Sequence, residues 1–398
     1  MAISELSVGP WLRLTALAAA HASGLAVVSG AVGGGVAHRA LAAVAVPPLA
    51  ALVVAAWVAH RRLLGPSLAA LGLFGAAALV TGRAAHIALA GLAFAAALVL
   101  AAVTMRGGER VAAGAWKDYI ALTKPRIMSL LLLTGLCGMV VGEHGLPPLW
   151  LVAVTMAGLA LACGGASALN HVLDRDVDRA MRRTAGRPVA SARVAPERAL
   201  EFGLALSAFS FVLLASLVNP LTAALALVGN LFYVIVYTGW LKRSTPQNIV
   251  IGGAAGAVPP LVGWAAATGN LTLPALFLFL IVFFWTPPHF WALALLIKRD
   301  YAAAKIPMLP VVRGDGETAR QILLYSLALV PVTALPFVWS TVGLPYLVAA
   351  LVLGAALVWL ALRLKREITP ARARLLFHFS LAYLALLFVA MALDPLVA

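Results

Sequence analysis

Long apolar runs alternate with short polar loops along almost the whole chain. A helix of about 20 apolar residues crosses the hydrocarbon core of a bilayer. Nine runs of roughly this length follow residue 105, at about 127–142, 149–170, 199–218, 221–238, 248–267, 273–296, 321–341, 345–362 and 375–393. The pattern predicts an all-α, polytopic membrane protein with nine transmembrane helices in this part of the chain.

Four further apolar runs precede these nine, at about 12–34, 40–59, 67–81 and 86–105. The stretch from Arg106 to Arg126 is polar and contains glycines, which marks a domain boundary. We therefore expect residues 1–105 to form a four-helix membrane extension and residues 106–398 to form the main domain. No small-residue cleavage site ends the first run, so we expect it to be retained as a helix.

Composition agrees with a membrane protein. Apolar residues make up 63% of the chain and charged residues 11%, and the mean hydropathy is +1.00; soluble domains contain roughly 25% charged residues. The net charge of +15 does not predict a nucleic-acid partner, because the basic residues are not interleaved with aromatic ones. Cys137 and Cys163 both lie in apolar runs, which argues against a disulfide framework or a thiolate metal site.

The basic residues are confined to every second loop. All 24 Lys and Arg residues after residue 105 fall within 106–126, 175–198, 242–243, 298–320 and 363–374. The alternate loops, near Glu143, Asn219, Asn270 and Gly343, contain none. The positive-inside rule places the basic loops in the cytoplasm and the C-terminus outside. For a bacterial protein this corresponds to a multi-pass protein of the inner membrane.

The most polar of these loops contains three oxygen ligands at regular spacing. Asn170, Asp174 and Asp178 stand at i, i+4 and i+8, so they drift only about 40° per step and line one helix face. Asp176 points roughly the opposite way. Such ligands suit Mg²⁺, which shares its shell with substrate phosphates. The alternative is a solvated loop whose Asp and Arg residues pair with one another. The basic residues that follow suit the phosphates themselves: Arg182, Arg183 and Arg187.

A second polar cluster follows the aromatic run Trp285–Trp291. Asp300 is a candidate for a further cation ligand, and its neighbours are candidates for binding phosphate or substrate: Lys298, Arg299, Tyr301 and Lys305. The alternative is a basic helix end that snorkels to the interface. His289 is either a packed interfacial residue or, loosened by Pro287 and Pro288, a ligand-facing one.

Two shorter basic stretches lie in loops on the same side. Lys124 and Arg126 precede the first of the nine runs, and Lys242 and Arg243 join two later ones. Each pair either binds substrate phosphate or only sets the topology.

Five stretches resemble the protoheme IX farnesyltransferase family of the intramembrane prenyltransferase superfamily. They are Tyr119–Arg126, Asn170–Pro188, Tyr237–Ile249, Pro288–Ala294 and Asp300–Val312. The resemblance covers roughly residues 116–398. It implies a nine-helix bundle around a cavity open to the membrane, with Mg²⁺ and farnesyl diphosphate at the cytoplasmic end. It also implies farnesyl transfer from that diphosphate to heme B, with addition of water, to give heme O. The superfamily's second motif usually has two Asp residues, and only Asp300 matches one here.

The extension resembles one half of heme A synthase. His38 and His86 open the second and fourth runs, and the resemblance implies that they hold a b-type heme as axial ligands. The alternative is that both lie at the interface and bind nothing. Heme A synthase and cytochrome oxidase assembly proteins are the partners that this context implies.

Two other functions remain open from sequence alone. One is a prenyltransferase acting on an aromatic quinone precursor, against which the Pro-His-Phe-Trp stretch argues. The other is a polytopic transporter or heme-holding scaffold. Transporters often show broken helices at the membrane midplane, whereas here the ionisable residues gather at one membrane face.

Overall fold

A computed structural model describes residues 10–32, 36–59, 61–79, 89, 91, 93–94, 96–97 and 114–397. The described residues form helices and connecting turns, with no β-strand among them. The all-α prediction is therefore confirmed for this part of the chain.

Nine helical segments among the described residues are long and apolar enough to cross a membrane. They are α6 Pro125–Glu143, α7 Leu149–Leu173, α9 Pro196–Leu217, α10 Pro220–Leu231 continued by the π-helix η1 Phe232–Leu241 and α11 Lys242–Ser244, α12 Asn248–Thr268, α13 Leu273–Leu296, α16 Gly314–Val338, α17 Leu344–Arg366 and α18 Pro370–Val397. Each matches one of the nine predicted runs.

The largest difference in boundaries is at the start of α16, which begins at Gly314 instead of residue 321. Its first turn contains Asp315 and Glu317. Carboxylates at a helix N-terminus interact favourably with the helix dipole. The helix therefore extends beyond the apolar run into residues that the hydropathy pattern assigned to a loop.

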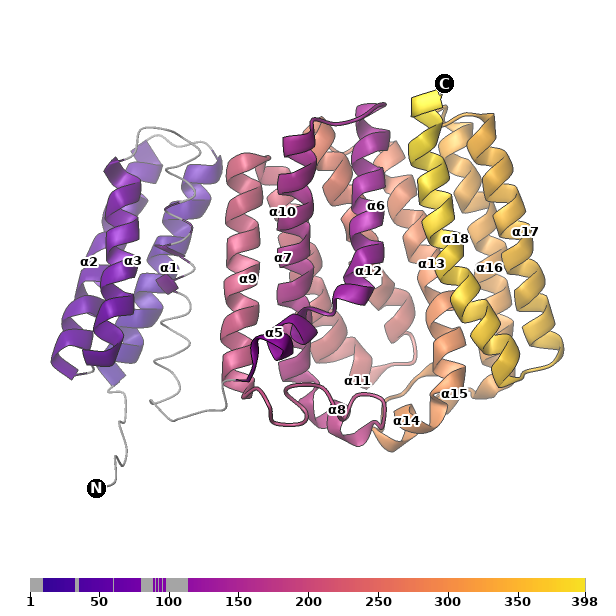
Figure 1. Cartoon of the computed structure of the whole chain (residues 1–398), viewed down its shortest axis with the longest axis horizontal. Coiled ribbons are helices and arrows are strands. Elements are labelled where there is room, and N and C mark those ends of the chain that lie inside the picture. Colours follow the sequence, from indigo (N-terminus) through magenta and orange to yellow (C-terminus); the bar gives the residue numbers. More distant parts are fainter. Residues whose placement is uncertain are drawn as a thin grey trace. The chain divides into compact units, whose positions relative to one another are not determined.

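Four short helices lie between the long ones. They are α5 Trp116–Thr123, α8 Arg175–Ala180, α14 Lys298–Ala303 and α15 Leu309–Val312. Figure 1 shows α8, α11, α14 and α15 at one end of their bundle, and the C-terminus at the other end.

The described residues divide into two compact units. The first contains the residues before Pro125 together with Ala160–Val172 and Arg187–Ala224. The second contains Pro125–Leu159, Leu173–Gly186 and the residues from Leu225 onward. Helix α7 contributes residues to both units.

Three of the four predicted N-terminal segments are helical: α1 Pro10–Val32, α2 Val36–Ala59 and α3 Arg61–Leu79. Alanine and leucine side chains such as Ala16, Leu49 and Leu52 form their common core. The fourth predicted segment lies mostly outside the described residues. That this extension crosses the membrane stays a prediction.

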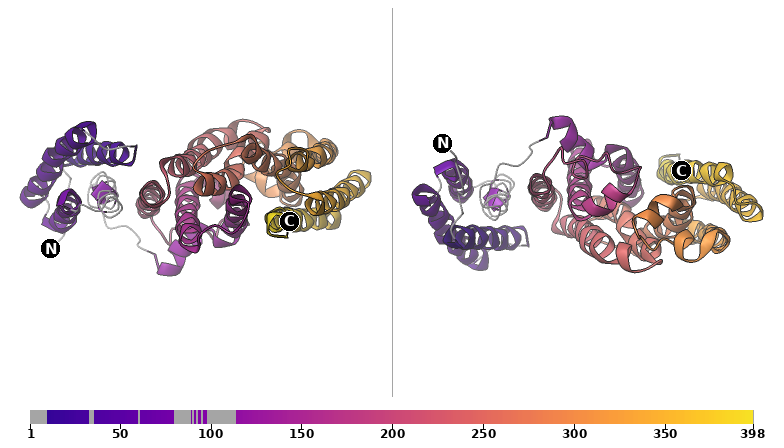
Figure 2. Two further views of the ribbon diagram at one scale, coloured as in Figure 1. Left: turned by 90° about the horizontal axis from the view of Figure 1, so that it is seen from above. Right: turned by 90° about the horizontal axis from the view of Figure 1, so that it is seen from below.

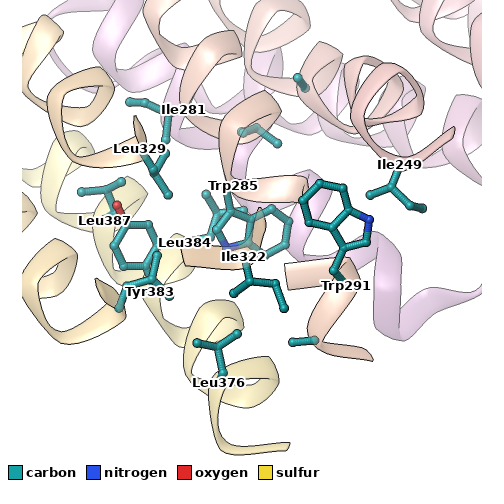
Figure 3. Close-up of a cluster of buried hydrophobic side chains, with 14 of the residues drawn as sticks. Ile249, Ile281, Trp285, Trp291, Ile322, Leu329, Leu376, Tyr383, Leu384 and Leu387 are labelled. Carbon is teal, nitrogen blue, oxygen red and sulfur yellow. The ribbon is translucent and has the colours of Figure 1, made fainter. Parts of the chain in front are cut away.

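The second unit has a continuous apolar core along α12, α13, α16, α17 and α18. Viewed end-on, these helices run roughly side by side (Figure 2). Figure 3 shows Trp285 of α13 beside Tyr383 and Leu384 of α18. Two large aromatic side chains, Trp285 and Tyr383, therefore lie at the α13–α18 contact.

Glycines bring α6 and α12 into close contact in the same unit. A β-carbon at Gly263 would collide with the backbone carbonyl of Gly135, and one at Gly138 would collide with that of Pro260. Small residues let membrane helices approach this closely and gain van der Waals contact between their backbones.

We predict that Gly263→Ala destabilises the protein by roughly 1–3 kcal/mol or more, because the new methyl group meets rigid backbone rather than a movable side chain. Gly256→Ala on the same helix is the matched control, since nothing lies within 4 Å of a β-carbon there. Thermal unfolding in detergent measures the difference. Equal melting temperatures for the two variants would contradict the proposed close packing.

Candidate functional site

Asp174 is a carboxylate without solvent contact in the second unit. It directly follows the last residue of α7 and precedes the first residue of α8, and its exposed fraction is 0%. The Nζ of Lys242 donates a hydrogen bond of 2.5 Å to its Oδ2, and Nη2 of Arg243 lies 3.9 Å from its Oδ1. A buried carboxylate needs such compensation, because an uncompensated charge is strongly destabilising in this environment.

Arg243 holds the junction between α7 and α8. Its Nη1 and Nη2 donate to the two carboxylate oxygens of Asp176 at 2.8 and 2.7 Å. Its Nη2 also donates to the backbone carbonyl of Leu173 at 2.7 Å. The guanidinium thus satisfies the last carbonyl of α7, which a helix end leaves without a backbone partner.

The same contact lowers the pKa of Asp176 to about 2, chiefly through its hydrogen bonds with Arg243. A carboxyl whose pKa is lowered in the folded state stabilises that state at pH values above its ordinary pKa. This contribution is lost as the pH falls towards about 2. Because the Asp176 side chain is 63% exposed, solvent screening keeps the contribution small.

The predicted single helix through the acidic motif is wrong in one respect, because the helix breaks at Asp174. At this break the guanidinium of Arg243 donates a hydrogen bond to the Leu173 carbonyl. The predicted division of the acids still holds: Asp174 and Asp178 are buried, whereas Asp176 is exposed. A backbone hydrogen bond of 2.7 Å from Asp178 to the Asp174 carbonyl preserves the helical turn between them.

Asp300 of α14 anchors the loop that follows α8. Its Oδ2 accepts a hydrogen bond of 3.3 Å from the backbone N–H of Arg183. Within the same loop, the Thr184 hydroxyl donates to the Asp178 carbonyl at 3.1 Å. No group of three His, Cys, Asp or Glu side chains with a metal-binding arrangement occurs among the described residues. The structure therefore brings Asp300 to the loop backbone and not into a three-carboxylate cluster.

In the first unit, Lys124 contacts Asn170, the amide residue of the acidic motif. Its Nζ donates to Oδ1 of Asn170 at 2.7 Å, and Asn170 is only 3% exposed. Lys124 has a φ of 51° and ends α5 in the left-handed conformation, which is unusual for a residue with a side chain. The Ser167 hydroxyl donates to the Leu122 carbonyl at 2.6 Å and fixes this turn on α7.

The remaining predicted substrate-binding residues differ in exposure. Lys298 forms an ion pair of 2.8 Å with Asp315, and Tyr301 is buried at 3% exposure. Arg187 is partly buried. The exposed basic residues of the predicted set are Arg126, Arg182, Arg183, Arg243, Arg299 and Lys305.

His289 of α13 is partly buried and packs against aromatic rings. The predicted heme ligands of the extension cannot be compared in the same way. His86 lies outside the described residues, and so does the side chain of His38.

Sequence reasoning assigned no role to two further residues. Tyr237 lies in the π-helix, close enough to Asp174 and Tyr301 for electrostatic interaction. The Thr238 hydroxyl donates to the Tyr233 carbonyl, five residues earlier, at 2.9 Å. π-helical turns are frequent at functional sites, but no local sequence signal predicts this one.

His171 is 2% exposed, and neither of its ring nitrogens has a hydrogen-bond partner. Its position directly after Asn170 is the sequence signal from which a role for His171 could have been predicted.

The model of the UbiA prenyltransferase family matches residues 131–389. The chain belongs to the UbiA prenyltransferase family. One similar relative is the protoheme IX farnesyltransferase of Symbiobacterium thermophilum, which is 56% identical over 70% of this chain and 94% of its own length. Another is the protoheme IX farnesyltransferase of Roseiflexus sp. strain RS-1, which is 45% identical over 91% of this chain and 75% of its own length.

Solved UbiA structures share the fold. A digeranylgeranylglyceryl phosphate synthase matches with a TM-score of 0.60 and 17% identity over 71% of this chain and 99% of that one. A UbiA homolog from Archaeoglobus fulgidus, bound to DMAPP and Mg²⁺, matches with a TM-score of 0.53 and 16% identity over 69% of this chain and 99% of its own. Together with the nine membrane-length helices, the family identifies a multi-pass membrane protein.

The UbiA match does not include the N-terminal extension, but the Roseiflexus relative does. Residues 116–398 make up 283 of the 398 residues, so an alignment over 91% of the chain must include part of the preceding segment. A related N-terminal segment is therefore present in at least one other member of this UbiA branch.

We predict that Lys242→Met lowers the stability of the second unit by about 3–5 kcal/mol, because Asp174 then stays buried without its ammonium partner. Adding Asp174→Asn should recover much of that loss, since the neutral amide needs no counter-charge. The matched control is Lys298→Met, whose partly exposed pair with Asp315 is worth about 0–1 kcal/mol. Unfolding midpoints of the four proteins measure the coupling. A K242M protein as stable as K298M would contradict the proposed dependence.

Proposed function

We propose that this UbiA-family protein transfers the farnesyl group of farnesyl diphosphate to a vinyl group of protoheme IX, with addition of water, to give heme O. The observation that carries the proposal is the identity of 45–56% with relatives named protoheme IX farnesyltransferase over 70–91% of the chain. The buried acidic motif and the cations around it are what such a diphosphate substrate requires.

Mg²⁺ is the metal that the donor set fits. The proposed ligands are oxygens of Asn170, Asp174 and Asp178, and all three residues are buried. Two of these ligands already have cationic partners, because Lys124 contacts Asn170 and Lys242 contacts Asp174. Hard oxygen ligands of this kind suit Mg²⁺ and disfavour soft metals. The Mg²⁺ bound to the Archaeoglobus homolog supports the same choice. When bound, the ion supplies positive charge for the departing diphosphate.

The chain's own residues bind and neutralise the diphosphate. Lys124 now contacts Asn170 and Lys242 contacts Asp174; each is proposed to bind a phosphate oxygen instead when the substrate is present. Further cations are available from the side chains assigned to phosphate binding, namely Arg126, Arg182, Arg183, Arg187, Arg243, Lys298 and Arg299. Because charge builds up on the leaving group in the transition state, such fixed cations accelerate cleavage of the carbon–oxygen bond.

The remaining steps need exclusion of water from the farnesyl cation rather than a nucleophilic side chain. The bond between farnesyl C1 and oxygen breaks with its electron pair going to diphosphate. The vinyl double bond then forms the new carbon–carbon bond, and water adds to the resulting heme cation and loses a proton. Phe279, Phe283 and Phe284 of α13 stack against one another, and we propose that such apolar side chains protect the farnesyl cation from early capture by water.

We further propose a bacterial inner-membrane location with the site's loops in the cytoplasm. The confinement of Lys and Arg to alternate loops supports this orientation. In the extension, His38 and His86 are proposed to bind a b-type heme, which the spacing of the two residues supports. Heme A synthase or cytochrome oxidase assembly proteins are the proposed protein partners, because heme O leads to the heme of that oxidase.

We predict that Asp174→Ala and Asp178→Ala each lower heme O formation more than about 10²-fold, because each removes a charge that holds the metal-bound diphosphate. Asp176→Ala is the matched control from the same loop. It should lose much less activity, since Asp176 is exposed and contacts Arg243 instead. Mass spectrometry of the heme products measures all three. Equal losses at Asp176 and Asp174 would contradict the proposed division of roles.

We also predict that removing Mg²⁺ with a chelator stops turnover while the helix bundle stays folded. The core of the second unit consists of apolar side chains, so circular dichroism and melting temperature should change little. Adding back Mg²⁺ should restore the activity. Full turnover in protein shown to contain no metal would refute the metal assignment.

A further inference from the structure

The imidazole of His289 is held between two aromatic rings. The ring of Trp285, one turn earlier on α13, stacks on one side with centroids 4.3 Å apart and an interplanar angle of 14°. The ring of Phe377 on α18 stacks against it at 4.8 Å and 23°. Both faces of the imidazole are thus covered, so only its edges remain for polar contacts.

One of these edges is already used. Nδ1 of His289 lies 2.7 Å from the hydroxyl oxygen of Ser380. That hydroxyl directs its own proton to the Phe377 carbonyl at 2.7 Å. Because a hydroxyl has a single proton, the Ser380 oxygen acts as acceptor and Nδ1 of His289 carries the hydrogen. The backbone carbonyl of Ser380 accepts a further hydrogen bond of 2.7 Å from Nε1 of Trp285, which fixes the same assembly.

The opposite edge therefore presents a lone pair. With hydrogen on Nδ1, Nε2 of a neutral imidazole is an acceptor. His289 is partly and not fully buried, although its two faces and its Nδ1 edge are covered. The accessible part of the ring is then the edge that contains Nε2. Such a ring can bind a partner only in its own plane, as an axial imidazole binds the iron of a porphyrin.

We propose that Nε2 of His289 is the axial ligand that binds the iron of the protoheme substrate. The inference rests on the proposed function, and it names the residue that recognises the acceptor. A metal-binding histidine characteristically donates its other ring N–H to an oxygen that fixes its tautomer, which is the role of Ser380 here. Iron ligation also orients the porphyrin, because the imidazole plane is fixed by Trp285 and Phe377.

The surroundings favour a ligand over a proton-accepting base. A base at Nε2 would place a positive charge between Trp285 and Phe377, in a ring whose contacts are two aromatic rings and the Ser380 hydroxyl. A charge in such apolar surroundings is costly. Ligation leaves the imidazole neutral and keeps the hydrogen bond to Ser380 intact. His289 is on α13, which is followed by α14 at the end of the bundle where the acidic helix α8 also lies (Figure 1).

The test is a titration of the purified full chain with ferric protoheme, followed by absorption and electron paramagnetic resonance spectroscopy. The extension's candidate ligands are removed first with His38→Ala and His86→Ala, so that their signal does not interfere. In this background we expect a histidine-ligated spectrum. His289→Ala should abolish it and weaken heme binding at least about tenfold, and added imidazole should restore the spectrum. Ser380→Ala should weaken binding by about 10-fold, the usual cost of losing an oxygen that orients a metal ligand.

Two variants keep the result interpretable. His378→Ala is the matched control, because His378 is exposed on α18 and its Nδ1 contacts the Arg374 carbonyl; it should leave the spectrum unchanged. His289→Cys offers a different ligand and should convert the spectrum to that of a thiolate-bound heme. This conversion shows ligation at position 289 even where His289→Ala folds poorly.

An unchanged spectrum and affinity in both His289 variants would overturn the proposal. Heme O production by the same preparations is measured separately. His289-dependent ligation without any heme O from the native chain would contradict the proposed function but leave the ligand assignment standing. Normal heme O formation by His289→Ala, with unchanged heme binding, would contradict the ligand assignment but leave the proposed function standing.

Discussion

The structure depends on cationic partners for carboxylates that are buried within the helix bundle. Asp174 is shielded from solvent, and the ammonium of Lys242 contacts it directly. Neither charge is tolerable alone in such surroundings. The π-helix η1 ends at Leu241, directly before Lys242. The position of this helix end therefore determines where the ammonium group lies. The pair therefore links the end of one membrane helix to the acidic junction between α7 and α8.

The neighbouring contacts follow from this arrangement. Arg243, next in the chain, reaches Asp176 and the last carbonyl of α7. Asp300 fixes the loop after α8 through the backbone of Arg183. The loops that carry the polar chemistry are thus held by side chains from helices far away in sequence. We propose that a diphosphate with its metal replaces these internal partners, because buried oxygens lie beside cations here.

Much of this was predictable, and the exceptions have physical causes. Hydropathy alone predicted the nine long helices, since a bilayer demands apolar segments of that length. Spacing alone predicted that Asp176 points away from Asp174 and Asp178; the structure adds that Asp174 and Asp178 are buried and that Asp176 is exposed. The helix break at Asp174 was not predictable, because the contact made there joins the Leu173 carbonyl to Arg243, 70 residues later in the sequence. The stacking of His289 likewise depends on Phe377 and Ser380 of α18, to which no local pattern connects it.

The central claim is that the buried acidic site serves farnesyl transfer to heme. The most direct measurement is an incubation of the purified full chain with farnesyl diphosphate and Mg²⁺ in the presence of both protoheme and an aromatic quinone precursor. Mass spectrometry then identifies which acceptor gains the farnesyl group. We expect heme O, with protoheme consumed and the aromatic acceptor unchanged. A prenylated aromatic product with intact protoheme, or no prenylated product from active and folded protein, would contradict the assignment.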